Sequence, residues 1–337
     1  MSLINIYPES PLLKKIELQR TTNHNIRPVC LFSDLDDSYI MKHWPTEEVL
    51  AANTQKYTDT ILSSDISLYQ PTVKLKEYLD ERNVPLVIVS GRDMYQMNEL
   101  IRAFSKLMPE SSQIMNFDAI IGAVGTEIYL RVNNEYVIDR EYEQLFKNSP
   151  FKREAVFGLL DGFIPKIRDT FKPVAFDFSK RDMPGSTQEL PPLPYKISLE
   201  FKSDYETSEK IKNEIISKLK ENNLESIQVL MSCPYAISAN INKYNIDIVP
   251  FAKDKPISYL KKLLNVTSVV AADSGNDLAM ITESADYAII VGNAKKELTE
   301  SIAKLSPNEK QHIYLASHDL QGPKAILTAL INYLPDR

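Results

Sequence analysis

The stretch VCLFSDLDDS, Val29–Ser38, places three aspartates directly after an apolar run. The run Val29–Phe32 is short and continuous, which is typical of a strand buried on both faces of a parallel sheet. Carboxylates crowded at such a strand end, here Asp34, Asp36 and Asp37, repel one another and lose solvation, so they need a compensating cation. A Mg²⁺ ion held by hard oxygen ligands would supply it and leave one carboxylate as a nucleophile toward a phosphoryl group. A solvated acidic turn is the alternative.

Further apolar runs of the same kind follow along the chain. They are Leu86–Val89, Ala119–Val124, Val266–Ala272, Ala288–Val291 and His312–Ala316. Helical patterns separate them, with Asp93 and Gln96 as a capping box. We expect Pro256 at the first position of a later helix and Gly322-Pro323 at the start of the last one. We therefore predict an α/β fold with a doubly wound parallel-sheet, Rossmann-like core, whose ligand crevice lies at the carboxyl ends of the strands.

Two more of these runs end in polar clusters. Ser90-Gly91-Arg92 follows the second run, where a hydroxyl and main-chain N–H groups can hold phosphate oxygens. An ordinary glycine turn is the alternative. Asp273-Ser-Gly-Asn-Asp277 follows the fourth run, and both of its aspartates can point toward Asp34 and Asp36. A plain turn and helix start is the alternative there.

A lysine at the start of the next helix can neutralise the nucleophilic aspartate and the phosphate together. The stretch Lys253-Asp254-Lys255-Pro256 offers two candidates. We choose Lys255, because it directly precedes Pro256 at the expected first helical position. A solvated surface lysine is the alternative.

The region from about Val132 to Val249 has a different pattern. It contains a Pro-rich loop, an amphipathic helix and short strand-like segments, at Met183–Pro194, Ile211–Leu219, Lys196–Phe201, Ile227–Met231 and Ala236–Asn240. We predict an inserted α+β cap domain at 132–251 and a discontinuous core domain at 1–131 and 252–337. One continuous α/β domain is the alternative. The roles of residues 1–28 and 39–67 are not predicted.

The motifs described above, in their order along the chain, resemble those of the haloacid dehalogenase superfamily of Mg²⁺-dependent phosphotransferases. This resemblance extends from Asp34 to about Leu330. The large insertion after Asp118-Ala-Ile-Ile-Gly-Ala-Val-Gly-Thr-Glu-Ile128 is similar to the α/β cap subclass. Further segments are similar to sucrose-phosphate phosphatases and their relatives: Asp273–Asp277, Val291-Gly-Asn-Ala294, Asp247-Ile-Val-Pro250 and Lys196-Ile-Ser198.

The resemblance implies a catalytic role for four residues. Asp34 would attack phosphorus and become an aspartyl phosphate. Asp36 would protonate the leaving oxygen and later activate the hydrolytic water. Ser90 would bind the phosphoryl group, and Lys255 would steady the charge of nucleophile and phosphate.

The resemblance also implies Mg²⁺ as the cofactor. The Asp34 carboxylate, the Asp36 main-chain carbonyl and Asp273 would hold it, with Asp277 and Asn276 in support. The other supporting positions are Ser38, Gly91, Arg92 and Ser274.

The composition argues against several other classes of protein. The 337 residues include only 9 glycines, and none forms a glycine-rich P-loop or dinucleotide-binding pattern. With 39 Lys+Arg against 45 Asp+Glu, the net charge is −6, which argues against a nucleic-acid partner. No apolar run reaches the roughly 18 residues that span a bilayer, and no signal-peptide pattern is present, so we expect no membrane association and a cytoplasmic location. Cys30 and Cys233 cannot form a disulfide framework.

Together these features predict a Mg²⁺-dependent phosphatase acting on a small phosphorylated metabolite, with a sugar phosphate as the leading substrate. The cap would close over the substrate and set specificity, and Lys196, Tyr195 and Tyr235 are the candidate contacts. Ordinary strand packing is the alternative for each of them. A phosphomutase or other phosphotransferase on the same fold is an alternative function, as is a catalytically weak protein-binding module.

Overall fold

The chain forms two compact units, seen in a computed structural model that describes residues 7–24, 26–41, 66–171, 174–178, 191–236 and 242–333. The core unit comprises Met1–Tyr142 and Lys253–Arg337, and the inserted unit comprises Glu143–Ala252. The insertion therefore starts later than position 132, where we expected it, because the hairpin before Arg140 belongs to the core sheet.

The core unit is built on an eight-stranded sheet with the order β12-β11-β10-β1-β2-β3-β4-β5. The strands are β1 (Val29–Asp34), β2 (Leu86–Val89), β3 (Ala119–Gly122), β4 (Glu127–Val132), β5 (Glu135–Ile138), β10 (Thr267–Ala272), β11 (Tyr287–Ile290) and β12 (Ile313–Leu315). Neighbours are parallel from β12 to β3, and these strands correspond to the predicted apolar runs. The predicted doubly wound α/β core is thus confirmed. The run expected to extend to Val124 ends as a strand at Gly122.

Strands β4 and β5 add an antiparallel hairpin to the β3 edge of the sheet. Their two-residue loop, Asn133-Asn134, has φ values of 50° and 66°. Asparagine tolerates this left-handed backbone better than most residues, and such loops match the twist of a hairpin.

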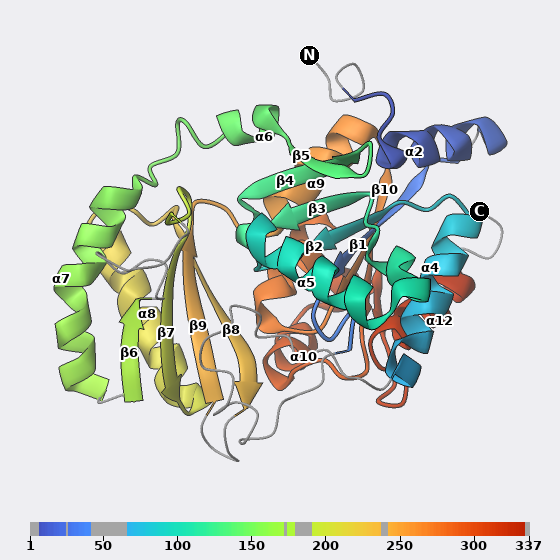
Figure 1. Cartoon of the computed structure of the whole chain (residues 1–337). Helices are drawn as coiled ribbons and strands as arrows, with labels where there is room; N and C mark the ends of the chain where they lie inside the picture. Colours follow the sequence, from blue (N-terminus) through green and yellow to red (C-terminus); the bar gives the residue numbers. More distant parts are fainter. Residues whose placement is uncertain are drawn as a thin grey trace. The chain divides into compact units, whose positions relative to one another are not determined.

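Helices cover both faces of this sheet (Figure 1). The helices α4 (Gln70–Glu81), α5 (Met94–Leu107) and α12 (Pro323–Tyr333) share one hydrophobic cluster with strand residues such as Leu31 and Ile88. The helix α9 (Asp254–Leu264) lies behind the sheet in Figure 1. The described part of this unit also contains α2 (Pro11–Thr22), α6 (Arg140–Gln144), which extends past Tyr142, α10 (Lys296–Ala303) and α11 (Pro307–Lys310).

Two of the three predicted helix starts agree with the structure. The Asp93 side chain accepts from Gln96 N (3.0 Å) and the Gln96 side chain accepts from Asp93 N (3.1 Å), so the capping box of α5 is confirmed. Helix α12 begins at Pro323 as predicted. The expected start of α9 at Pro256 is wrong, because the helix begins at Asp254. Proline is tolerated in a first turn, where N–H groups have no partner inside the helix.

Helix α2, which we did not predict, is attached to the amino ends of the strands. The Gln19 side chain donates to Val29 O (2.9 Å) and Asn83 O (2.8 Å) and accepts from Val29 N (2.7 Å). Lys15 Nζ lies 2.9 Å from the fully buried Asp118 Oδ2. These contacts stabilise the sheet at the amino ends of its strands, whereas Asp34 lies at the carboxyl end of β1.

The inserted unit is an antiparallel sheet with two helices on one face (Figure 1). Its strands, in the order β6-β7-β9-β8, are β6 (Val174–Phe178), β7 (Ile197–Ser203), β9 (Asn242–Val249) and β8 (Gln228–Ala236), and its helices are α7 (Arg153–Phe171) and α8 (Tyr205–Glu221). Apolar side chains of both helices pack on β7 and β9. The unit has the predicted α+β composition, although most of the predicted loop Met183–Pro194 and of the strand Ala236–Asn240 lies outside the described residues.

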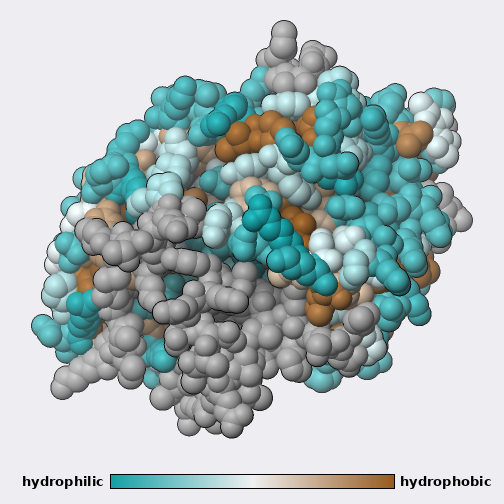
Figure 2. Space-filling view, in the orientation of Figure 1, coloured by the Kyte–Doolittle hydropathy of each residue, from teal (hydrophilic) through white to brown (hydrophobic). Residues whose placement is uncertain are grey.

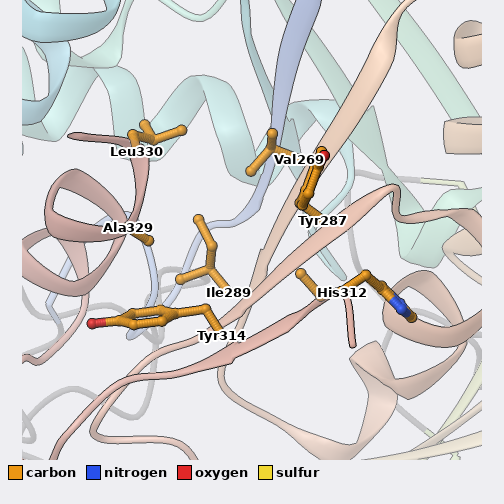
Figure 3. A pocket seen from close by; sticks show the side chains of 8 residues that line it. Val269, Tyr287, Ile289, His312, Tyr314, Ala329 and Leu330 are labelled. Carbon is orange, nitrogen blue, oxygen red and sulfur yellow. The ribbon is translucent and has the colours of Figure 1, made fainter. Parts of the chain in front are cut away.

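A small apolar pocket lies between α12 and the strands β10 to β12 (Figure 3). Its lining residues are Val269, Tyr287, Ala288, Ile289, His312, Tyr314, Ala329 and Leu330. None of them is a carboxylate, and none lies at the carboxyl end of its strand, so the pocket is no candidate for phosphoryl chemistry. Figure 2 shows a mostly hydrophilic face on which apolar residues form separate patches.

Candidate active site

Two of the predicted carboxylates lie at the carboxyl ends of neighbouring strands. Strand β1 ends at Asp34, and Asp273 directly follows β10, its parallel neighbour. The chain continues from β1 toward β3 on one side and returns through β10 on the other, so this is the switch point at which open α/β sheets bind ligands. Asp277 joins them from the 3₁₀ turn Gly275–Asp277. One oxygen from each of these three buried carboxylates lies within 4.8 Å of the others.

A buried lysine connects two of these carboxylates. Lys253 Nζ lies 2.7 Å from Asp34 Oδ1 and 2.6 Å from Asp277 Oδ1. Its side chain is only 1% exposed. A lysine is rarely buried this deeply unless carboxylates pair with it, so the three side chains form one unit.

The prediction of Lys255 as the active-site lysine is therefore wrong. The Lys255 side chain is 59% exposed and pairs with Asp254 at 3.2 Å. We placed Lys255 before the first helical residue, but α9 begins at Asp254, which makes Lys253 its N-cap residue. If the helix is predicted to begin at Asp254 instead of Pro256, the lysine directly before its first residue is Lys253.

The protonation of this group follows from its burial. Burial raises the pKa of Asp34 to about 7; Lys253 opposes the rise, and the carboxylates of Asp277 and Asp36 add to it. Burial also raises the pKa of Asp273 well above its ordinary range. For Lys253, burial lowers the pKa, but Asp277 and Asp34 outweigh this effect and raise the pKa above its ordinary value. Burial thus disfavours the ionised forms of Asp34 and Asp273, and a bound cation would stabilise those forms.

Asp36, in the loop after β1, pairs with an arginine from the loop after β2. Arg92 Nη2 lies 3.3 Å from Asp36 Oδ2 and 3.4 Å from Asp36 Oδ1. The Asp36 side chain is 24% exposed, compared with 10% for Asp34. Asp36 is therefore the more accessible carboxylate of the two, which suits a group that exchanges protons.

Ser90 follows β2, the neighbour of β1 on the side away from β10. Its side chain is buried, and its hydroxyl oxygen accepts from Arg92 N (3.1 Å). Because the hydroxyl is the acceptor in that bond, its own hydrogen can serve a second partner such as a phosphate oxygen.

The Ser90–Arg92 loop is held by a turn with unusual backbone geometry. Ala123 and Val124 have φ values of 48° and 62°, and the left-handed region is a genuine outlier for a β-branched residue. Val124 N donates to Ser90 O (3.1 Å), and Ala123 N donates to Arg92 O (2.7 Å). A backbone of this kind costs about 1–3 kcal/mol per residue and persists only where its surroundings impose it. The turn therefore holds both ends of the Ser90–Arg92 loop.

The donor set fits a hard divalent cation. Mg²⁺ in proteins is bound by one or two carboxylates together with water and substrate oxygens. Asp277 Oδ1 accepts from Lys253, and Asp277 Oδ2 accepts from Ser274 N (3.2 Å) and Ser274 Oγ (3.1 Å). Both of its oxygens are thus engaged by the protein. Asp34 and Asp273 are the better candidates for direct ligands, and Asp277 holds Lys253.

The other predicted supporting residues lie in the surrounding loops. Ser274 Oγ also lies 2.7 Å from Asn276 Oδ1, so Asn276 Oδ1 and Asp277 Oδ2 share its one hydrogen. Ser38 is fully buried in the loop after β1. A Cβ atom at Gly91 would lie 3.8 Å from Val124 Cγ2, so Gly91 is close to the strained turn. These contacts shape the loops that carry the charged groups.

The predicted contact residues of the inserted unit have different surroundings. Lys196 Nζ lies 3.2 Å from Asp247 Oδ1, to which Ser198 Oγ donates at 2.6 Å. Tyr195 stacks on Phe146 with ring centroids 4.7 Å apart, so it takes part in packing. Tyr235 lies in β8, and its side chain is outside the described residues.

Comparison with known proteins identified one matching family model. The model for sucrose-6F-phosphate phosphohydrolase matches residues 28–167 and 185–334. No curated protein sequence matches the chain. Within the described part of the chain, no helix has both the length and the apolar character needed to cross a membrane.

Solved structures share the fold at low sequence identity. A HAD/COF-like hydrolase from Plasmodium vivax is 14% identical, with a TM-score of 0.51, and the match covers 94% of this chain and 99% of that one. A haloacid dehalogenase-like hydrolase from Bacteroides thetaiotaomicron is 15% identical, with a TM-score of 0.50, and the match covers 91% of this chain and 100% of that one.

Proposed function

The chain belongs to the sucrose-6F-phosphate phosphohydrolase family of haloacid dehalogenase-like phosphatases, and we propose that it is a Mg²⁺-dependent phosphatase of a sugar phosphate. The buried group of Asp34, Asp273, Asp277 and Lys253 carries this proposal. At the switch point of the sheet, Asp34 as the proposed nucleophile lies beside a buried lysine and two carboxylates that could bind a metal, and this combination suits phosphoryl transfer.

The proposed reaction begins with Asp34. One Asp34 oxygen attacks phosphorus, the bond between phosphorus and the substrate oxygen breaks, and Asp36 donates a proton to that leaving oxygen. Asp36 then takes a proton from a water molecule, whose oxygen attacks phosphorus, and the bond between phosphorus and the Asp34 oxygen breaks, which releases inorganic phosphate and restores the Asp34 carboxylate. Lys253 holds Asp34 in place and balances the charge of the phosphoryl group. Bound Mg²⁺, with Asp34, Asp273 and the Asp36 carbonyl as its proposed ligands, would stabilise charge on the phosphoryl oxygens.

The loop after β2 has two tasks in this scheme. Ser90 donates its hydroxyl hydrogen to a phosphoryl oxygen. Arg92 fixes the Asp36 carboxylate through the contact at 3.3 Å. The strained turn at Ala123 and Val124 keeps this loop in place, so little reorganisation is needed when the phosphoryl group binds.

We assign substrate specificity to the inserted unit. Lys196 lies with Ser198 and Asp247 in a polar cluster on its sheet, and such a cluster can recognise the hydroxyl groups of a sugar. Tyr195 is committed to packing on Phe146, so we retain Lys196 as the candidate contact.

A phosphate-release screen tests the proposed function. With Mg²⁺ present, the protein is expected to release inorganic phosphate from at least one sugar phosphate in a panel that includes sucrose 6-phosphate, hexose phosphates, nucleotides and a phosphopeptide. EDTA is expected to stop the release, and added Mg²⁺ is expected to restore it, because the carboxylate group needs the cation. Release that persists in EDTA would contradict the metal requirement, and release from the phosphopeptide alone would contradict the substrate class.

The raised pKa of Asp34 predicts how Mg²⁺ binding depends on pH. In the metal-free protein this pKa is about 7, well above the ordinary 3.8, so folding takes up a proton between these values. The contribution of Asp34 to stability therefore falls as the pH rises through this window. Mg²⁺ must displace that proton, and also any proton on Asp273, so its affinity is expected to be at least about tenfold weaker at pH 6 than at pH 8. Calorimetric titration at both values measures this, and equal affinities would contradict it. Lys253 stays charged throughout this range.

A further inference from the structure

The segment Val291-Gly-Asn-Ala294, which follows β11, has no role in the scheme above. Within it, the side-chain amide of Asn293 joins two other loops of the core unit. Asn293 Nδ2 donates to Asp37 O at 2.8 Å, and Asn293 Oδ1 accepts from Gly322 N at 2.7 Å. Both partners are main-chain atoms, so Asn293 contacts the backbone of these loops rather than their side chains.

The main chain also determines the orientation of this amide. Rotating it by 180° would place Asn293 Oδ1 against the carbonyl of Asp37 and Asn293 Nδ2 against the N–H of Gly322. Two acceptors and two donors would then face each other. Aspartate at position 293 could accept from Gly322 N but could not donate to Asp37 O, so the two contacts can be separated experimentally.

The loop that Asn293 holds is the one that carries Asp36. Asp37 has a φ of 61°, in the left-handed region that aspartate and asparagine adopt more readily than other residues except glycine. Asp37 N donates to Ile40 O at 2.8 Å, which closes the turn on one side. The bond from Asn293 holds the Asp37 carbonyl on the other side. Because Asp36 and Asp37 share a peptide unit, fixing Asp37 also limits how far the Asp36 carbonyl can move.

The support behind Asn293 is rigid. A Cβ atom at Gly292 would lie 2.0 Å from Ser317 O, so the two main chains are in direct contact there. Gly292 N also donates to Leu320 O at 2.8 Å. Gly322 has a φ of 47°, and a Cβ atom there would lie 3.2 Å from Ser38 O. It directly precedes α12, which packs in the hydrophobic core.

We propose that Asn293 is a positioning residue that fixes the Asp36–Asp37 peptide, and with it the Asp36 carbonyl, for Mg²⁺ binding. This inference rests on the proposed function, because it assigns that carbonyl to the metal. Residues that orient a metal ligand from outside the coordination shell typically change metal affinity by about 10- to 100-fold when they are replaced.

The test measures Mg²⁺ binding by calorimetry in the absence of substrate, for the wild type, Asn293→Asp and Asn293→Ala. Both variants lose the bond to Asp37 O, and both are expected to bind Mg²⁺ about tenfold or more weakly than the wild type. Asn293→Asp keeps an acceptor for Gly322 N, so it retains the anchor at α12 and is the variant expected to fold normally. Its added negative charge alone would strengthen cation binding, so weaker binding in this variant is evidence for positioning. Asn308→Asp in the exposed helix α11 adds the same charge elsewhere and is the control.

Two results would overturn this role. In one, both variants bind Mg²⁺ as tightly as the wild type, even if their melting temperatures fall, which would leave Asn293 with a purely structural role. In the other, Asn293→Asp binds Mg²⁺ more tightly, which would show that charge rather than position matters. If the wild type itself bound no Mg²⁺, the proposed metal requirement would fail together with this inference. If the wild type binds Mg²⁺ and the variants bind it equally well, only this inference fails, so the two failures are distinguishable.

Discussion

The Asp34→Asn variant is expected to release no measurable phosphate from any substrate that the wild type accepts. The amide of asparagine is a poor nucleophile, and an aspartyl phosphate cannot form without the carboxylate. A loss of roughly four orders of magnitude or more in kcat is expected, as for other covalent catalysts that lose their nucleophile. Phosphate release at saturating Mg²⁺ and substrate measures it. A variant that retained most of its activity would contradict the proposed mechanism.

The structure predicts that this variant stays folded. Lys253 would keep Asp277 as a partner at 2.6 Å, and one of several mutually repelling carboxylates would be removed. We therefore expect a melting temperature of the metal-free variant at least equal to that of the wild type. Asp286→Asn is the matched control, because Asp286 also pairs with a lysine, Lys261, at 2.8 Å. Asp286 directly precedes β11, so it lies at the amino end of that strand and away from the active site at the carboxyl ends. Its activity is expected to be close to that of the wild type.

Much of the core fold could be predicted because its parallel strands are buried on both faces. Such strands give continuous apolar runs, and every residue of β1 and β10 is indeed buried. The carboxyl ends of neighbouring parallel strands lie at one edge, so the prediction that Asp34 and Asp273 lie close together followed from the topology. The start of α5 at Asp93 could also be predicted, because Asp93 and Gln96 have the spacing of a capping box.

The elements that were missed have weaker local signals. Strand β4 is half-buried with alternating exposure, and its hairpin loop Asn133-Asn134 was the clearest indication of the pairing with β5. Helix α7 contains Pro165 and two glycines, which obscure its helical pattern. Contacts such as that of Asn293 with Asp37 join residues far apart in the chain, and no local pattern specifies them.

The active-site lysine shows the same limit. Lys253 and Lys255 are separated by one residue, and neither the spacing nor the composition of this stretch distinguishes them. The deciding quantity is burial, which depends on where α9 begins and on the carboxylates of β1 and the turn after β10. Those partners lie 219 and 24 residues away from Lys253 in the sequence.

Replacing Lys253 and Lys255 separately by methionine tests this assignment. Methionine removes the charge of either lysine and keeps an unbranched side chain. Lys253→Met is expected to lower kcat by about 10²- to 10³-fold, because a preorganised charge beside the nucleophile is lost. Lys255→Met is expected to retain the wild-type kcat, since that side chain is exposed and pairs with Asp254 rather than with Asp34. Initial rates at saturating substrate and Mg²⁺ measure both variants.

Stability provides a second readout for the same pair. Lys253→Met leaves Asp34 and Asp277 buried without their shared cation, and breaking a buried pair in this way typically costs about 3–5 kcal/mol of unfolding free energy. The metal-free variant should therefore melt well below the wild type, and added Mg²⁺ should recover part of the difference by neutralising Asp34. Rates are compared at a temperature at which both variants are folded, so that the loss of kcat is not a loss of folded protein. If Lys255→Met lost activity while Lys253→Met kept it, the lysine beside Asp34 would have to be Lys255, and the geometry from which we assign the nucleophile would be wrong as well.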